Sequence, residues 1–151
     1  MRPSRQREAG EVIITHLDRE ELLRREPTVF GGTSPGDKES FRLTFPINDP
    51  QGVVCWEAFE AGRSTEWAFW HSEFHVCLGG SAEVTYTLPP NHQQVLTTSI
   101  RAGDAVLILA GTRARFDVPD GEPYVHVSLF QPRYEYARYL LDQRYGDLDR
   151  R

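Results

Sequence analysis

Cysteine is scarce in the chain, and its spacing is not that of a metal or redox motif. Cys55 and Cys77 are the only two cysteines in 151 residues, each lies in an apolar run, and no CxxC pair is present. A disulfide framework is typical of secreted chains. We therefore expect two buried free thiols.

Long apolar runs and excess positive charge are also lacking. The longest apolar run covers residues 105–110, against about 18 residues for a membrane span, and residues 1–8 are charged, unlike a signal peptide. Lys and Arg number 17 and Asp and Glu number 22, which gives a net charge of −5. That balance disfavours nucleic acid and anionic membranes as partners, and we expect a cytoplasmic protein.

The composition, 39% hydrophobic and 26% charged, is that of one soluble domain spanning 1–151. The glycine patterns of phosphate- and dinucleotide-binding loops are absent, as is the GxSxG nucleophile motif. These absences exclude the commonest nucleotide-binding and serine-hydrolase signatures.

Short β-rich runs dominate the middle of the chain. They are separated by turn clusters about every 8–12 residues, as in a sandwich or barrel. The expected strands are 40–45, 53–59, 67–78, 82–88, 95–100, 105–109, 115–118 and 123–130. We predict an all-β fold with a barrel core at about 40–131.

One short helix is expected near each end. Asp18 and Glu21 form a capping-box pair, and Pro27 ends the first helix. Tyr136 and Tyr139 stand at helical spacing, which predicts a terminal helix at about 133–145 packed on the sheet.

Two expected strands alternate polar and apolar side chains, and alternate residues of a strand share a face. In the first run the polar face carries His71, Glu73, His75 and Cys77, and the apolar face carries Phe74, Val76 and Leu78. In the second run the polar face carries Tyr124, His126 and Ser128, and the apolar face carries Val125, Val127 and Leu129. The polar faces either meet solvent or point into the barrel, and three of the five histidines favour the interior.

Strand geometry limits how these polar residues could hold a metal ion. His71 and His75 would lie roughly 13 Å apart along a straight strand, too far to share one ion. The site should therefore combine Glu73 with either His71 or His75, and His126 is the best third ligand. Two imidazoles and one carboxylate suit a divalent ion such as Fe, Zn, Mn or Ni. The alternative for each histidine is a hydrogen-bonded interior imidazole.

The runs 73–84 and 101–111 together resemble the two motifs of the cupins. Glu73 is followed seven residues later by Gly80, as at the end of the first cupin motif, and Gly103-Asp104 and Gly111 match the second. The resemblance covers roughly 53–130. It implies a jelly-roll β-barrel with its site in the mouth and, commonly, a dimer.

The resemblance is incomplete at the metal ligands. The paired histidines of the first motif would fall near Ala68 and Trp70, and the histidine of the second at Arg113 or Ala114. Only Glu73 matches a ligand of the family.

Among cupins, the pattern looks closest to the ectoine-synthase-like proteins. The matching pieces are Ala-Gly at 61–62, the aromatic run 67–70, His-Ser-Glu at 71–73 and Phe-Gln-Pro at 130–132. This resemblance implies a metal-dependent lyase.

Several further residues are candidates for binding substrate. Arg113 and Arg115 follow the second motif, and guanidinium groups suit carboxylate-bearing molecules, although both could be surface arginines. Trp70 and Tyr86 could line the pocket. Tyr124 could act with Glu73 and His71 in catalysis as an acid or hydrogen-bond donor.

Three functions remain open at this point. The first is a metal-dependent enzyme that eliminates, cyclises or isomerises a small carboxylate-bearing metabolite. The second is a non-heme iron dioxygenase, and the third a metal-free cupin that binds a small molecule. The apolar strand faces around Phe74 and Val127 further predict a homodimer.

Overall fold

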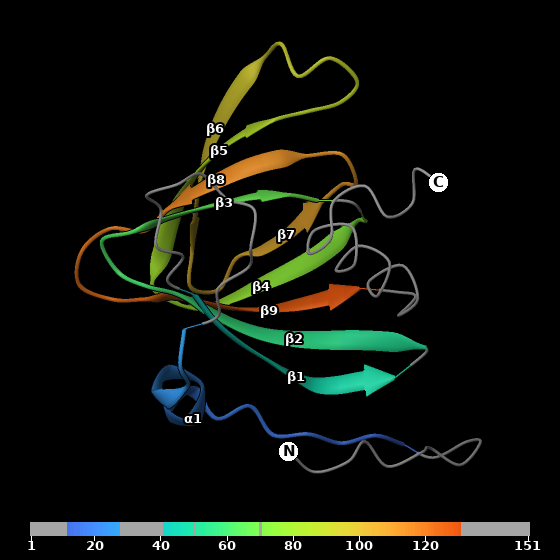
Figure 1. The fold of residues 1–151 in the computed structure, drawn as a ribbon, viewed down its shortest axis with the longest axis vertical. Coiled ribbons are helices and arrows are strands. Elements are labelled where there is room, and N and C mark those ends of the chain that lie inside the picture. The colour runs from blue at the N-terminus through green and yellow to red at the C-terminus, as the bar shows by residue number, and fades with distance from the viewer. Residues whose placement is uncertain (1–11, 28–40, 50, 70, 131–151) are drawn as a thin grey trace.

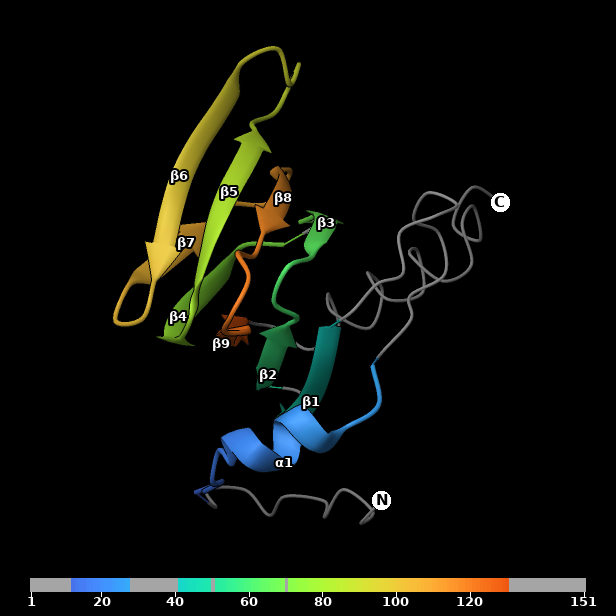
Figure 2. The same ribbon diagram turned by 90° about the vertical axis from the view of Figure 1, so that its left-hand side faces the viewer.

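Two antiparallel sheets face each other in the computed structural model, which describes residues 12–27, 41–49, 51–69 and 71–130 (Figures 1 and 2). In spatial order, the first sheet contains β1 (Phe41–Asp49), β2 (Gly52–Phe59), β9 (Tyr124–Phe130), β4 (Glu73–Gly79) and β7 (Ala105–Ile108). The second contains β3 (Ser64–Ala68), β8 (Arg113–Asp117), β5 (Ser81–Thr87) and β6 (Val95–Arg101). The predicted all-β jelly-roll is confirmed.

One expected strand was wrong, because the run 67–78 forms two strands in different sheets. The chain leaves β3 in the second sheet and enters β4 in the first. Two backbone hydrogen bonds hold this crossing: Phe69 N–H donates to the Thr112 carbonyl at 2.8 Å, and Gly111 N–H donates to the Phe69 carbonyl at 2.6 Å. The sequence did not reveal the crossing, because residues 69–73 contain no glycine or proline that would mark a break between strands.

Aromatic side chains fill much of the space between the sheets. Phe59 of the first sheet meets Phe116 of the second edge to face, with ring centroids 5.4 Å apart, and Tyr124 lies beside both at 5.7 and 6.1 Å. Such edge-to-face and tilted contacts stabilise a core beyond its buried area.

The predicted N-terminal helix is confirmed as α1 (Arg19–Arg24). The Asp18 side chain caps it by accepting hydrogen bonds from the N–H groups of Glu20 and Glu21 at 2.9 and 3.1 Å. Leu22 is buried in an apolar cluster with residues of β2 and β9, which include Val125 and Val127. The helix therefore covers these two valines, which the sequence analysis assigned to a dimer interface.

The rest of that outer face remains exposed. It carries five large apolar side chains on and beside β4, β7 and β9: Phe74, Leu78, Leu107, Leu109 and Leu129. No charged residue interrupts it on these three strands.

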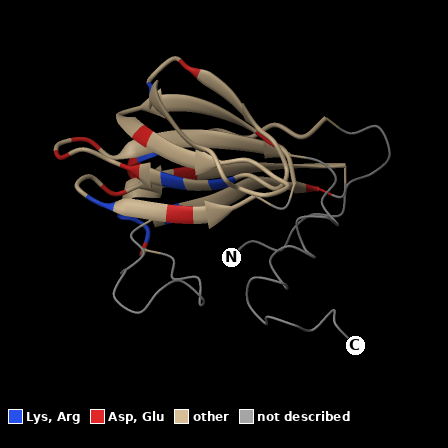
Figure 3. Cartoon of the chain, turned by 90° about the horizontal axis from the view of Figure 1, so that it is seen from above, with Lys and Arg blue, Asp and Glu red and all other residues tan. Residues whose placement is uncertain are grey.

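Charged residues of both signs are interspersed over strands and loops, and neither sign forms a separate face in Figure 3. Among the described residues, no helix is long and apolar enough to cross a membrane. The predicted C-terminal helix at about 133–145 lies outside the described residues.

Candidate functional site

A polar patch lies on the inner face of the first sheet, where β2, β9 and β4 are neighbours. Glu57 of β2 is directly opposite His126 of β9, and Ser128 of β9 is opposite His75 of β4. Directly opposite side chains lie about 5 Å apart at Cβ, and diagonal ones remain within reach of long side chains. The strand register therefore assembles carboxylates and imidazoles from three strands.

Glu73 lies between two histidines and contacts both. His71 Nε2 is 2.8 Å from Glu73 Oε1, and His75 Nε2 is 2.8 Å from Glu73 Oε2. The expectation that a single metal ion would take only one of the two histidines together with Glu73 concerned ligation and stays a prediction. Without an ion, the carboxylate lies between the two rings and offers each one a separate oxygen.

The two histidines keep Glu73 ionised although it is only 7% exposed. Burial acts to raise the pKa of its carboxyl, but the hydrogen bonds from His71 and His75 outweigh burial and lower the pKa to about 2. A carboxylate that accepts such bonds is favoured in its charged form.

A second carboxylate–imidazole pair is formed by Glu57 and His126. His126 Nε2 lies 2.9 Å from Glu57 Oε2, and the Cys55 thiol donates a hydrogen bond to the other Glu57 oxygen at 3.1 Å. The His126 ring stacks on that of His75, with centroids 4.6 Å apart and an interplanar angle of 23°. This stacking joins the two pairs into one interior cluster.

The two members of this second pair have pKa values displaced by burial and by each other. Burial acts to raise the pKa of Glu57, but the contact with His126 outweighs it and lowers the pKa. For His126, burial and the nearby His75 lower the pKa, against the opposing effect of Glu57. At neutral pH the pair is therefore a carboxylate beside a neutral imidazole.

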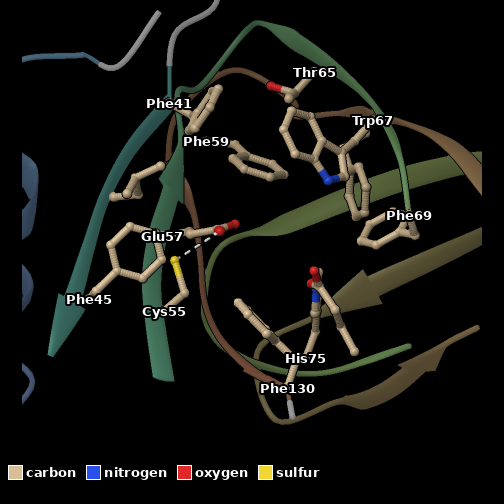
Figure 4. Close-up of a pocket in the computed structure, with 13 residues that line it drawn as sticks. Phe41, Phe45, Cys55, Glu57, Phe59, Thr65, Trp67, Phe69, His75 and Phe130 are labelled. Atoms are coloured by element: carbon tan, nitrogen blue, oxygen red, sulfur yellow. Dashed lines mark hydrogen bonds and ion pairs between the residues drawn. The ribbon is translucent and has the colours of Figure 1, made fainter. Parts of the chain in front are cut away.

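A small cavity adjoins both pairs, and Figure 4 shows Glu57 and His75 on its walls. Seven aromatic side chains line it, among them Phe59, Trp67 and Phe69. The polar lining consists of Cys55, Glu57, Thr65, Glu73 and His75. The space open to water is about 50 Å³, enough for about three to five water molecules.

The sequence-predicted residues do not all meet at this cavity. Tyr124 is fully buried, with its ring 4.8 Å from that of His126, and it is not among the lining residues. Burial raises the pKa of Tyr124. Trp70 lies outside the described residues.

Arg113 and Arg115 lie on the outer face of the second sheet. Their neighbours on β8, Ala114 and Phe116, are buried, and strand alternation directs the arginines the opposite way. Together with Tyr86 they line a separate open depression over β3, β5 and β8. The structure therefore separates these three expected substrate-binding residues from the Glu73 cavity.

Glu57 is the functional residue that the sequence analysis missed. It is the only charged residue of β2, whose other members are apolar apart from Gly52 and Cys55. A lone carboxylate on a buried strand needs an interior partner, and this was the signal that could have found it.

The donor set has the chemistry of a divalent-metal site, but not its arrangement. Two imidazoles and a carboxylate are suitable ligands. Within the described ranges, however, no group of three His, Cys, Asp or Glu side chains is placed to hold a metal ion. His71 and His75 contact different oxygens of Glu73, and His126 contacts Glu57. As arranged, these residues do not fit a preformed three-ligand centre.

Comparison with known proteins identifies the fold. No known protein family profile matches the chain, and no curated protein matches it. Among solved structures, the Bacillus halodurans protein BH2720 is similar at 16% identity and a TM-score of 0.57, over 82% of this chain and 84% of that one. The EutQ protein of Clostridium difficile is similar at 13% identity and a TM-score of 0.51, over 64% and 71%.

A further similar structure is the oxalate decarboxylase of Bacillus subtilis, a protein with Mn(II) centres. The identity is 18% and the TM-score 0.52, and the match covers 72% of this chain but only 28% of the decarboxylase. These similarities, together with the two-sheet jelly-roll and its motif glycines, show that the chain has the cupin fold.

Proposed function

We propose that this cupin binds a small molecule in the aromatic cavity and transfers a proton on it without redox chemistry, as in an isomerisation or elimination. The observation that carries the proposal is the contact between His75 Nε2 and Glu73 Oε2, 2.8 Å long, at the cavity wall. A histidine held by a carboxylate is a common general base.

The protonation state of Glu73 assigns the tautomer of His75. An ionised carboxylate only accepts hydrogen bonds, so when the His75 ring carries a single proton, that proton is on Nε2. The lone pair is then on Nδ1, which is buried and has no hydrogen-bond partner among the described residues. In this proposal the bound molecule reaches Nδ1, which is closed off in the ligand-free structure, through a shift of the ring; Nδ1 then takes its proton, and Glu73 stabilises the imidazolium that forms.

The cavity lining favours a different substrate from the carboxylate-bearing one expected from sequence. Arg113 and Arg115 lie on the other side of the second sheet, and no lysine or arginine is among the described lining residues. Glu57 and Glu73 would repel an anion. A neutral or cationic molecule fits better.

The experiment is a hydrogen–deuterium exchange screen with small molecules that carry acidic C–H groups, followed by proton NMR in D2O. We expect exchange to be catalysed by the wild type and to fall about 100-fold or more in His75→Gln. His92→Gln, in the loop after β5, is the matched control and should exchange like the wild type. Equal rates in the wild type and His75→Gln would contradict the proposal.

The alternative function, a metal-dependent enzyme, is tested by measuring the metal content of the same protein purified without chelator. One equivalent of a divalent metal that is lost in Glu73→Gln would replace general-base catalysis with metal-assisted chemistry. The Mn(II) centres of oxalate decarboxylase make this measurement worthwhile. Oxygen consumption by the metal-loaded protein would further favour a dioxygenase.

A further inference from the structure

We propose that the ligand of the cavity is a small alkylated ammonium ion. This inference rests on the proposed function only in using the same cavity, and it names the chemical class of the substrate. Two carboxylates, Glu57 and Glu73, and seven aromatic side chains line the space, whereas the described lining contains no lysine or arginine.

Glu57 supplies the first argument, because its negative charge lacks a cationic partner among the described residues. Its contacts are the Cys55 thiol and the His126 ring. Neither group is a lysine or arginine, and both are buried. The Glu57 side chain is only 21% exposed, and an anion that is largely withdrawn from water without a cationic partner is unfavourable. A bound cation would reduce that cost.

The second argument is the position of Glu57 relative to the aromatic rings. Its carboxylate projects from β2 into the space that Trp67 and Phe69 border on the opposite side, and Phe59 lies two residues further along β2 (Figure 4). The faces of aromatic rings attract cations, and quaternary ammonium groups are recognised in aromatic cages. Methyl groups on the nitrogen also suit apolar walls. A neutral ligand would leave Glu57 unpaired, and an anion would meet two like charges.

The third argument is size. About 50 Å³ of space is open to water, which corresponds to a ligand of about three to five non-hydrogen atoms. Compact methylated amines have this size.

Isothermal titration of the full chain with three compact probes tests the charge preference. The probes are tetramethylammonium chloride, neutral tert-butanol and sodium acetate, compared at equal ionic strength. We expect tetramethylammonium to bind at least about tenfold more tightly than tert-butanol and acetate not to bind. Equal or tighter binding of tert-butanol or acetate would overturn the inference.

Variants then assign the preference to the cavity. Glu57→Gln should weaken tetramethylammonium binding by about tenfold and leave tert-butanol binding unchanged. Glu66→Gln is the control, because Glu66 is an exposed carboxylate on the outer face of β3. An unchanged tetramethylammonium affinity in folded Glu57→Gln would show that Glu57 does not bind the cation. If that variant does not fold, the wild-type probe series and Trp67→Leu, which should also weaken the cation selectively, decide the question.

Failure of this inference is distinguishable from failure of the proposed function. Tetramethylammonium has no exchangeable proton, so its binding does not depend on proton transfer. Cation binding without His75-dependent exchange would remove the catalytic proposal alone. Exchange on neutral molecules without cation binding would remove the ammonium inference alone.

Discussion

His126 Nε2 lies 2.9 Å from Glu57 Oε2, directly across from it on the neighbouring strand. Glu73, the carboxylate expected to partner His126, instead contacts His71 and His75. The interior therefore holds two carboxylate–imidazole units that touch through the stacked rings of His75 and His126.

The pairing of Glu57 and His126 should appear as energetic coupling. His126→Ala leaves the partly buried Glu57 carboxylate without its imidazole, and we expect the free energy of unfolding to fall by about 1–3 kcal/mol. Adding Glu57→Gln should recover part of that loss, with a coupling energy of about 1–3 kcal/mol in urea denaturation. A control cycle of His126→Ala with the remote Glu66→Gln should be additive. Additivity in both cycles would show that the contact between Glu57 and His126 does not contribute to the free energy of unfolding.

The ionised state of Glu73 should make stability depend on acid pH. Its pKa falls from 4.5 to about 2 on folding, so the folded state binds the proton less readily than the unfolded chain. The resulting stabilisation, about 3 kcal/mol, is present above pH 4.5 and is lost as pH falls toward 2.

Urea denaturation of the wild type and Glu73→Gln across this range measures that contribution. The difference in unfolding free energy between the two proteins should shrink as the pH falls from about 5 to about 2. A difference that does not change with pH would contradict the pKa assignment.

Gly80, in the turn between β4 and β5, should tolerate a side chain less well than Gly103, in the turn between β6 and β7. Its φ of +69° disfavours side chains, and a Cβ atom would collide with the carbonyl oxygen of Pro123. Gly103 has a φ of +96° and open space around it. Both alanine variants should lose about 1–2 kcal/mol from backbone strain, and Gly80→Ala about 2 kcal/mol more from the collision. Equal thermal stabilities of the two variants would argue against this contact.

The exposed face of β4 and β7 should form the interface with a second copy of the chain. Phe74 and Leu107 are cross-strand partners there, 56% and 52% exposed. A twofold interface brings the same face of two copies together. Because β4 and β7 present no charge on this face, that contact would bury no unpaired charge. Sedimentation should give about twice the monomer mass of 17.3 kDa.

Phe74→Glu should convert this dimer to a monomer, whereas Val95→Glu, at a position 65% exposed on β6 of the other sheet, should leave it intact. A monomeric wild type at micromolar concentration would remove the prediction.

Strand alternation accounts for how much of the site could be predicted from the sequence. It correctly indicated that Glu73, His75 and His126 point inward, because polar and apolar residues alternate on β4 and over residues 124–129 of β9. The same rule applied to β8 would have directed Arg113 and Arg115 outward. Their position after the second motif was given more weight, and this led to the expectation of a carboxylate-bearing substrate.

Other features of the site depend on contacts between segments that are distant in the sequence. Glu57 meets His126 because β9, the last strand of the chain, lies between β2 and β4 in the sheet. No local sequence pattern specifies this strand order. The cavity likewise depends on how rings such as Phe59 and Phe116 pack across the two sheets. Its volume and charge could be read only from the folded chain.

Helix α1 lies on the reverse side of the strands that carry Glu57 and His126. Trp56 and Val125 pack against Leu22, and they alternate along β2 and β9 with the cavity-side residues. The Trp56 indole N–H also donates to the carbonyl of Asp18 at 3.3 Å. Only the β2 backbone thus separates the Trp56 indole from the cavity. A ligand that displaces β2 should therefore change the fluorescence of Trp56 without contacting it.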